Sequence, residues 1–226
     1  MHRRARHLNP KAAGALIALD ARFLSLSGGS SVSTWTNRTG SNDLTQATSA
    51  NQPTFQTAVQ GGSPVVRFDG SNDGMSVGNS LNFTNELTFI AVLKSSTSGN
   101  FTIFAKEGDD VEFGLWGTAG TVLAQSGIKF LVTEGTSSPT TWQIATTNWN
   151  GVSTAAVYRN SLQLNQLTNI SVTLINRLTS QVGRNNTSGF FNGDMGIVTC
   201  IPIYLSTALR KRLEQAGAMA YKIACN

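Results

Sequence analysis

The chain has 226 residues, a length at which all-β sandwiches often form one domain. Hydrophobic residues make up 40% and charged residues only 13%, which suits a core that needs no disulfides and excludes coiled-coil, long-helix and disordered classes. The net charge of +5 comes from the two ends of the chain. Residues 1–22 have five basic side chains and one acidic one, and residues 210–226 have four basic side chains and one acidic one. Residues 23–209 have eight basic and ten acidic side chains. Nucleic acid is therefore not an expected partner of the body.

Residues 1–18 are expected to form a basic N-terminal arm, with Arg3, Arg4 and Arg6 ahead of the apolar stretch at residues 12–19. That stretch is too short and too interrupted for a conventional signal peptide, and no segment approaches the roughly 18 apolar residues of a membrane helix. We expect a soluble protein with no membrane partner. The three arginines suit docking on a carboxylate-rich surface of a neighbouring copy or another subunit.

Residues 19–226 are expected to form one domain of about a dozen short strands, because apolar runs alternate with Gly, Asn, Ser and Asp clusters. The expected strands are Val65–Phe68, Met75–Val77, Leu87–Lys94, Phe101–Lys106, Val111–Trp116, Ile128–Glu134, Trp142–Thr147, Thr154–Arg159, Ile170–Ile175, Ser180–Gly183 and Gly196–Tyr204. This pattern predicts an all-β fold, a two-sheet antiparallel β-sandwich of the jelly-roll kind. A hairpin is expected at Tyr158–Gln163, turning through Asn160, and Phe68 and Phe89 are expected in the core on neighbouring strands.

Only the end of the chain has a helical period, which predicts one amphipathic helix at 206–224 with Ser206 or Thr207 as N-cap. Its apolar stripe consists of Leu209, Leu213, Ala216, Ala220 and Ile223. The opposite face has charged side chains that are expected in solvent, namely Arg210, Arg212, Glu214 and Lys222.

Several segments together carry a family resemblance. They are Leu19–Ala21, Val32–Trp35, Leu44–Ala47, Gln52–Phe55, Val65–Asp73, Phe89–Lys94, Val182–Arg184, Phe191–Gly196 and Tyr204–Ser206. In this order they resemble the concanavalin A-like, laminin G-like domains of bacteriophage and bacterial surface proteins, from about residue 8 to the end. The resemblance implies a jelly roll, a fold that hosts lectins, adhesion modules, hydrolases and structural subunits alike.

The sequence contains few residues that could form a catalytic site. Histidine occurs only in the arm, at His2 and His7, so the body cannot build a Ser-His-Asp system or a His-based zinc site. The one dense acidic cluster consists of Glu107, Asp109, Asp110 and Glu112. Hydrolases of the family that the sequence resembles have alternating Glu, Asp and Glu on one strand, and Asp110-Val111-Glu112 lacks the third acid. No catalytic residue is therefore expected.

Binding residues are easier to nominate. Trp149 and Trp116, beside Gly- and Asn-rich loops, together with Asp109 and Asp110, are the candidate ligand contacts, although tryptophans in a sandwich more often pack in the core. Trp35 and Trp142 are expected in the core.

No metal site and no cofactor are expected. Calcium binding stays open, because Asp69, Asn72 and Asp73 offer oxygen ligands within five residues. Such residues also form tight turns, and a turn is the favoured interpretation. Cys200 and Cys225 are expected to be buried or idle thiols, and a bridge between them cannot be inferred.

These observations favour a non-enzymatic binding or structural module, and first among such modules a bacteriophage virion subunit that decorates the capsid or serves tail adhesion. Its partners would be other virion or surface-assembly proteins, further copies of itself, or glycans, at a virion or extracellular surface. Two alternatives stay open, a bacterial carbohydrate-binding or adhesion module and a glycan hydrolase or lyase.

Overall fold

The computed structural model describes residues 14–78, 81, 86–106, 111–116, 120–125, 131–133, 140–169, 179–185 and 189–225. Of residues 111–112, 115–116, 120–125 and 131–133 the backbone alone is described. The expected docking residues Arg3, Arg4 and Arg6 and the expected strand at 170–175 lie outside these ranges.

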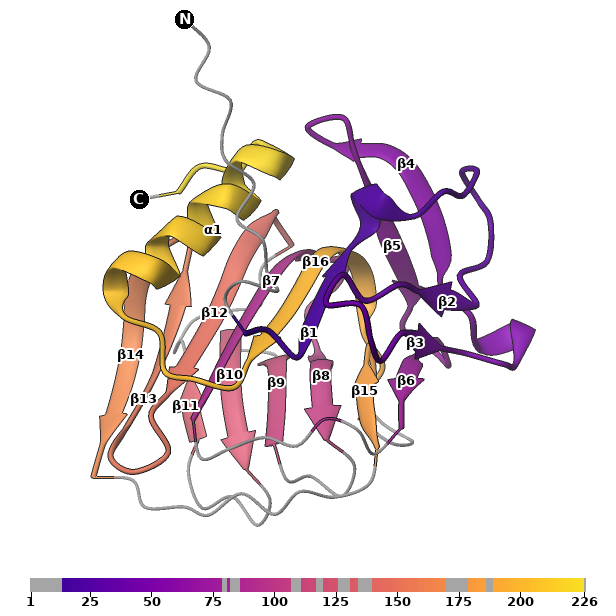
Figure 1. Ribbon diagram of the computed structural model, residues 1–226. Coiled ribbons are helices and arrows are strands. Elements are labelled where there is room, and N and C mark those ends of the chain that lie inside the picture. The colour runs from indigo at the N-terminus through magenta and orange to yellow at the C-terminus, as the bar shows by residue number, and fades with distance from the viewer. Residues whose placement is uncertain are drawn as a thin grey trace, which may run out of the picture.

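Two antiparallel sheets pack face to face and confirm the predicted β-sandwich (Figure 1). Sheet A contains, in spatial order, β14 (Leu162–Thr168), β13 (Thr154–Arg159), β12 (Gln143–Trp149), β7 (Leu87–Ser95), β16 (Asn192–Ile201), β5 (Ser63–Asp69) and β4 (Thr54–Gln60), and β1 (Ile17–Asp20) also pairs with β16. Sheet B contains β11 (Leu131–Thr133), β10 (Gly120–Gln125), β9 (Val111–Trp116), β8 (Asn100–Lys106), β15 (Ser180–Val182), β6 (Met75–Val77), β3 (Leu44–Thr45) and β2 (Thr34–Trp35). The first strand, β1, begins at Ile17, inside the range expected for the arm.

The strands were predicted from short apolar runs bounded by polar clusters, and the predicted strands that fall on described residues overlap observed strands. Most of the expected runs coincide with strands, and the hairpin between β13 and β14 turns through Asn160 and Ser161, both with positive φ. The short strands β1, β2 and β3 and the more polar β4 and most of β14 were not expected, because two to four residues or mostly polar residues give no clear period. The strand β10 was not expected either.

The core between the sheets is aromatic at its centre. Phe89 of β7 stacks against Phe113 of β9, with ring centroids 5.5 Å apart, and contacts Phe104 of β8 at 5.0 Å. Phe68 is buried as well, as expected. The two phenylalanines do not lie on neighbouring strands, however, because β16 pairs with both β7 and β5 and so separates them.

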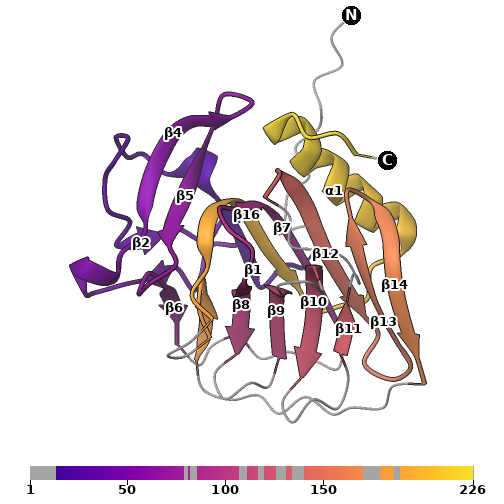
Figure 2. The same ribbon diagram turned by 180° about the vertical axis from the view of Figure 1, so that it is seen from behind.

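The helix α1 (Thr207–Tyr221) packs on β7 and β12, on the face of sheet A that is turned away from sheet B (Figures 1 and 2). Because the helix covers this face, nearly every residue of β7 is buried. Ser206 caps the helix by accepting a hydrogen bond from the Leu209 N–H, as predicted. Gly217 allows close packing, since a Cβ there would lie only 3.0 Å from a methyl group of Val92. No helix in the described part of the chain has the length and apolarity to cross a membrane.

The face that α1 buries differs from the expected one. The residues buried on it are Arg210, Glu214, Gly217, Ala218 and Tyr221, and the predicted apolar stripe is only half-buried along one side. Arg212 and Lys222 are exposed as expected, but the expectation was wrong for Arg210 and Glu214. These two side chains form an ion pair with each other and contact the β13–β14 hairpin, which makes their burial tolerable.

A buried amide holds the segment that leads into the helix. The side-chain oxygen of Asn148 in β12 accepts hydrogen bonds from the Thr88 hydroxyl and the Leu205 N–H, at 2.7 and 3.1 Å, and its amide group donates to the Leu205 carbonyl at 2.9 Å. Asn148 therefore holds Leu205, the residue before the N-cap of α1, against sheet A.

Candidate binding groove

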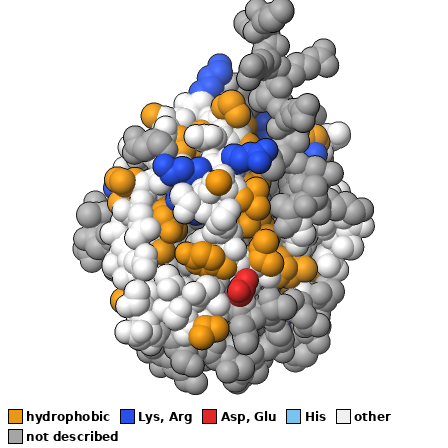
Figure 3. Space-filling view, turned by 60° about the vertical axis from the view of Figure 1, so that its left-hand side comes forward, with side chains coloured by type: hydrophobic (Ala, Val, Ile, Leu, Met, Phe, Trp, Pro, Cys, Tyr) orange, Lys and Arg blue, Asp and Glu red, His pale blue; other side chains and the backbone are white. Residues whose placement is uncertain are grey.

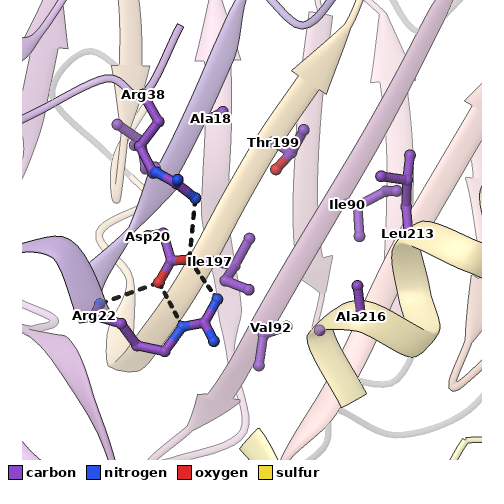
Figure 4. Close-up of a pocket in the computed structure, with 12 residues that line it drawn as sticks. Ala18, Asp20, Arg22, Arg38, Ile90, Val92, Ile197, Thr199, Leu213 and Ala216 are labelled. Atoms are coloured by element: carbon purple, nitrogen blue, oxygen red, sulfur yellow. Dashed lines mark hydrogen bonds and ion pairs between the residues drawn. The ribbon is translucent and has the colours of Figure 1, made fainter. Parts of the chain in front are cut away.

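A groove, called the helix groove below, opens on the outer face of sheet A between β1 and α1 (Figure 4). It encloses a hollow of about 80 Å³. Its apolar lining residues are Ala18, Leu19, Ile90, Val92, Ile197, Leu213 and Ala216, with Gly217 beside them. Thr199 adds a hydroxyl, and Asp20, Arg22 and Arg38 form the polar side of the groove. The alternation of β-strands explains the floor, since Ile90 and Val92 of β7 both point to the outer face.

Asp20 organises the polar side of the groove. Its side chain caps the short 3-10 helix Ala21–Phe23, where Oδ1 accepts from the Arg22 N–H at 3.1 Å. The Arg22 guanidinium then binds the same carboxylate twice, from Nε to Oδ1 at 2.9 Å and from Nη2 to Oδ2 at 2.6 Å. This hydrogen bond raises the pKa of Arg22 above its ordinary value, so the guanidinium stays charged. Arg22 thereby neutralises Asp20, which is itself buried.

Arg38 forms a long ion pair with the same carboxylate but no hydrogen bond to it. Its Nη1 lies 3.9 Å from Asp20 Oδ2, too far for a hydrogen bond, and its guanidinium stacks 3.6 Å from the centroid of the half-exposed Phe23 ring. The Arg38 side chain has no hydrogen bond to any described residue and keeps 30% of its surface exposed. Its N–H donors are therefore available to a ligand.

Asn37 fixes the position of Arg38 relative to β1. Its side-chain oxygen accepts from the Ala18 N–H and its amide donates to the Leu16 carbonyl, both at 2.9 Å. These bonds tie the loop after β2 to the edge of β1, although the two segments lie about twenty residues apart in the sequence.

The charged side chains at the helix groove are mostly arginines. Arg22 and Arg38 lie beside Asp20, which is buried and paired, and Arg212 is exposed on α1 one turn before the lining residue Ala216. On the face shown in Figure 3, Lys and Arg side chains gather in the upper half, with hydrophobic side chains between and below them. The groove thus combines an apolar floor with excess positive charge, an arrangement that binds a group with a short apolar part and an anionic end.

Of the ligand contacts nominated from the sequence, Trp149 is the one whose side chain the structure describes, and it does not lie at this groove. Trp149 is fully buried in the core between the sheets, so its ring packs there and is not displayed at the surface. Trp116 ends β9, and its side chain is not described, while Asp109 and Asp110 lie outside the described residues. Trp35 is buried as expected.

The other residues singled out from the sequence, Trp142 and the two cysteines, do not line the groove. Trp142 is half-buried and stacks on Tyr221 of the helix. Cys200, buried, and Cys225, half-buried, are both free.

The Asp69–Asp73 segment is a turn whose carboxylates bond to its own backbone. Asp69 Oδ1 accepts from the N–H groups of Ser71, Asn72 and Asp73 at 2.8 to 3.4 Å, and Asp73 Oδ2 accepts from the Asp69 N–H at 2.9 Å. Burial in the first place, and the Asp69 charge in addition, raise the pKa of Asp73 to about 6. This supports the turn interpretation, and the described residues contain no group of three metal-ligating side chains.

Sequence reasoning missed the residues that form the groove. Leu19-Asp20-Ala21 was noticed only as part of a resemblance, and Arg22, Phe23 and Arg38 were not singled out. One local signal was present, because an Asp before Ala-Arg-Phe at the end of an apolar run is typical of a capped turn. The pairing of β1 with β16, which brings Asp20 beside the helix, leaves no trace in the local sequence.

No protein-family model and no curated protein matches this sequence. Solved structures do match in fold. Domain 4 of AbnA, an extracellular GH43 arabinanase of Geobacillus stearothermophilus solved with arabinotriose, has a TM-score of 0.57 at 16% identity over 71% of this chain and 81% of its own. The binding domain of Paraclostridial Mosquitocidal Protein 1 has a TM-score of 0.64 at 13% identity, covering 91% of this chain and 52% of its own.

A third similar structure is an enzyme. Trypanosoma rangeli sialidase, solved as a covalent intermediate, has a TM-score of 0.53 at 12% identity, and the match covers 92% of this chain and 34% of that one. This chain therefore spans about half of the mosquitocidal binding domain and a third of the sialidase. At such identities the comparisons show the β-sandwich fold, while the concanavalin A-like, laminin G-like class stays an expectation from the sequence.

Proposed function

We propose that this protein is a non-enzymatic binding module that works as a subunit of a larger particle, of the kind that decorates a bacteriophage virion, and that it contacts its partner through the helix groove. One observation carries the proposal that this is a binding module. At the side of an apolar hollow, Arg38 has N–H donors with no hydrogen bond to any described residue, and its ion-pair partner Asp20 is already bound twice by Arg22. Such unsatisfied donors beside apolar surface are what a binding partner completes.

The groove supports binding better than turnover. A glycosidase needs two carboxylates on either side of the scissile bond, one of them able to give up or accept a proton. Among the residues that line the groove, Asp20 is the single carboxylate, and it accepts hydrogen bonds from Arg22 through both oxygens. Both oxygens of this carboxylate are engaged by the Arg22 guanidinium, and no second carboxylate belongs to the described lining to work with it.

Glycan binding is the second candidate, and the comparison with AbnA favours it. That domain has a similar sandwich and was solved with arabinotriose. A carbohydrate-binding role for this chain would place the ligand at the helix groove or on another face of the sandwich. Binding to a glycan array that is insensitive to the groove would favour this alternative over a particle subunit.

The test is to express the tagged protein in its native source and purify it without denaturant. Three forms are compared: the wild type, Arg38→Gln, and Arg67→Gln. The last is a matched control, because Arg67 is also a surface arginine of sheet A that binds one carboxylate, Asp194, in two hydrogen bonds, away from the groove. We expect the wild type and Arg67→Gln in an assembly several times the monomer mass, and Arg38→Gln mainly as monomer. Wild-type protein that stays monomeric would contradict the proposal.

A further inference from the structure

The size of the hollow limits what can enter the helix groove. Pockets that enclose a whole small molecule typically measure about 300 to 1,000 Å³. The hollow here is about 80 Å³, so it has room for one short side chain and not for a sugar ring. The group that enters must therefore be small, with the rest of the ligand outside.

The lining selects an aliphatic group. Ile90, Val92 and Ile197 form the floor and Leu213 and Ala216 the helix side, while Thr199 contributes one hydroxyl. A sugar would need several hydrogen-bonding partners for its hydroxyls, and their loss on burial would cost affinity. A branched aliphatic side chain loses nothing in these surroundings and gains from its burial.

The polar side of the groove selects a carboxylate. The N–H donors of Arg38 have no hydrogen bond to any described residue, and the planar fork of its guanidinium matches a carboxylate through two parallel hydrogen bonds. Stacking on Phe23 holds the guanidinium in one orientation. Arg212, exposed on α1 one turn before Ala216, favours further negative charge on the part of the ligand outside the hollow.

From these three constraints we propose that the helix groove binds the C-terminal residue of an acidic partner polypeptide, with an aliphatic side chain in the hollow and the terminal carboxylate on Arg38. A C-terminal residue is the simplest unit that has both groups on one carbon atom. This inference rests on the proposed function, since it names the chemistry of the partner that the groove would hold.

The test uses short peptides as probes. Acetyl-Glu-Glu-Leu with a free terminal carboxylate is titrated into isotope-labelled full-length protein, and amide shifts are followed by NMR. The same peptide with a C-terminal amide, acetyl-Glu-Glu-Ala with a free carboxylate, and D-glucuronic acid are the comparison ligands. We expect the free acid of the leucine peptide to bind about tenfold more tightly than its amide and about tenfold more tightly than the alanine peptide. The shifts should map to β1, β7 and α1.

Variants locate the interaction. Arg38→Gln should bind the acid and the amide equally, Arg38→Lys should recover part of the difference, and Arg67→Gln should behave as the wild type. Ala216→Leu, which fills the hollow, should remove the preference for leucine over alanine. Thermal midpoints of all variants show whether each one is folded.

Four results would overturn this inference: equal affinity for acid and amide in the wild type, shifts that map away from the groove, tighter binding of glucuronic acid than of the leucine peptide, or no binding of any probe. None of these results touches the assembly experiment, in which the native partner is present, so the chemistry proposed here can fail while the proposed function stands.

Discussion

Arg210 and Glu214 form an ion pair that is almost fully excluded from solvent, one turn apart on α1. Nη1 of Arg210 lies 2.8 Å from Oε1 and 2.7 Å from Oε2 of Glu214. The Ser161 hydroxyl donates to Oε2 at 2.7 Å, and the guanidinium lies 3.7 Å from the centroid of the Tyr158 ring. The pair therefore attaches the helix to the β13–β14 hairpin of sheet A.

The first prediction concerns this pair. Arg210→Ala leaves the Glu214 carboxylate buried without its cation, and breaking a buried ion pair in this way typically costs about 3 to 5 kcal/mol. We expect a decrease of that size in the free energy of unfolding, measured by urea titration. The control is Arg212→Ala on the exposed side of the same helix, where a change within about 0.5 kcal/mol is expected.

The double variant Arg210→Met, Glu214→Leu should recover most of the loss, because a well-packed apolar pair replaces two buried charges without the cost of desolvation. If Arg210→Ala and Arg212→Ala destabilised the protein equally, the contact with the hairpin would have no measurable energetic role.

The helix shows what sequence periodicity can and cannot predict. The apolar spacing from Leu209 to Ile223 predicted a helix with nearly the observed bounds and the observed N-cap. It did not predict which side of the helix is buried, because charged side chains such as Arg210 and Glu214 are normally expected in solvent. Their burial depends on Tyr158 and Ser161, which lie about fifty residues away in the sequence, and no local pattern reports such a contact.

The same limit applies to the sheets and to the groove. Phe68 and Phe89 were correctly predicted as core residues, since each lies in a strongly apolar run. The sequence could not show that β16 lies between their strands, because the order of strands depends on pairing between distant segments. Asp20 and Arg38 meet for the same reason, through the pairing of β1 with β16 and the hydrogen bonds of Asn37. Trp149 was nominated from its polar flanks, but its position on the inner face of β12 places it in the core.

The second prediction concerns the aromatic core. Phe89→Ala removes a fully buried ring that contacts Phe104 and Phe113, and such truncations typically cost about 3 to 5 kcal/mol. Phe68→Ala should cost about the same. Phe23→Ala is the matched control, because half of that side chain is exposed and a much smaller change is expected. Near-neutral results for both buried positions, by chemical denaturation, would mean that this core is not well packed.

The third prediction concerns catalysis. The body has no histidine, and the sequence lacks the complete alternating acidic motif, so we expect no measurable hydrolysis of glycans in a screen with polysaccharide substrates. The decisive variant is Glu112→Gln on β9, in the one dense acidic cluster of the sequence. Turnover by the wild type that this substitution abolishes would replace the non-enzymatic function with a hydrolase.

The fourth prediction concerns the basic arm. Deletion of residues 1–7 should leave the thermal midpoint of the monomer almost unchanged, since few apolar groups there offset the cost of ordering the backbone. Removal of Arg3, Arg4 and Arg6 should sharply reduce incorporation into the assembly, because the arginines suit carboxylates of a neighbouring subunit. Quantitative mass spectrometry of purified particles measures the effect, and equal incorporation of the shortened protein would refute a docking role.

The last prediction concerns the pH dependence of stability, through the turn after β5. Burial, with the charge of Asp69 in addition, raises the pKa of Asp73 to about 6 from an ordinary value of 3.8. Above pH 6 the ionised carboxylate is therefore less favourable in the folded state than in the unfolded state. As the pH falls from 6 towards 4, the folded chain takes up a proton before the unfolded chain does, and the contribution of Asp73 to stability rises. Asp73→Asn removes this titration and keeps an oxygen that can accept from the Asp69 N–H. We expect the variant to be more stable than the wild type by about 1 to 3 kcal/mol at pH 8 and equally stable near pH 4, by urea unfolding at both pH values.

Asp69→Asn should show the opposite sign. Burial raises the pKa of Asp69, but hydrogen bonds from three backbone N–H groups lower it by more, so the net pKa is lowered. The advantage of the wild type over Asp69→Asn should therefore be present at neutral pH and lost as the pH falls. A stability difference for Asp73→Asn that does not change between pH 4 and pH 8 would show that Asp73 does not titrate as its burial requires.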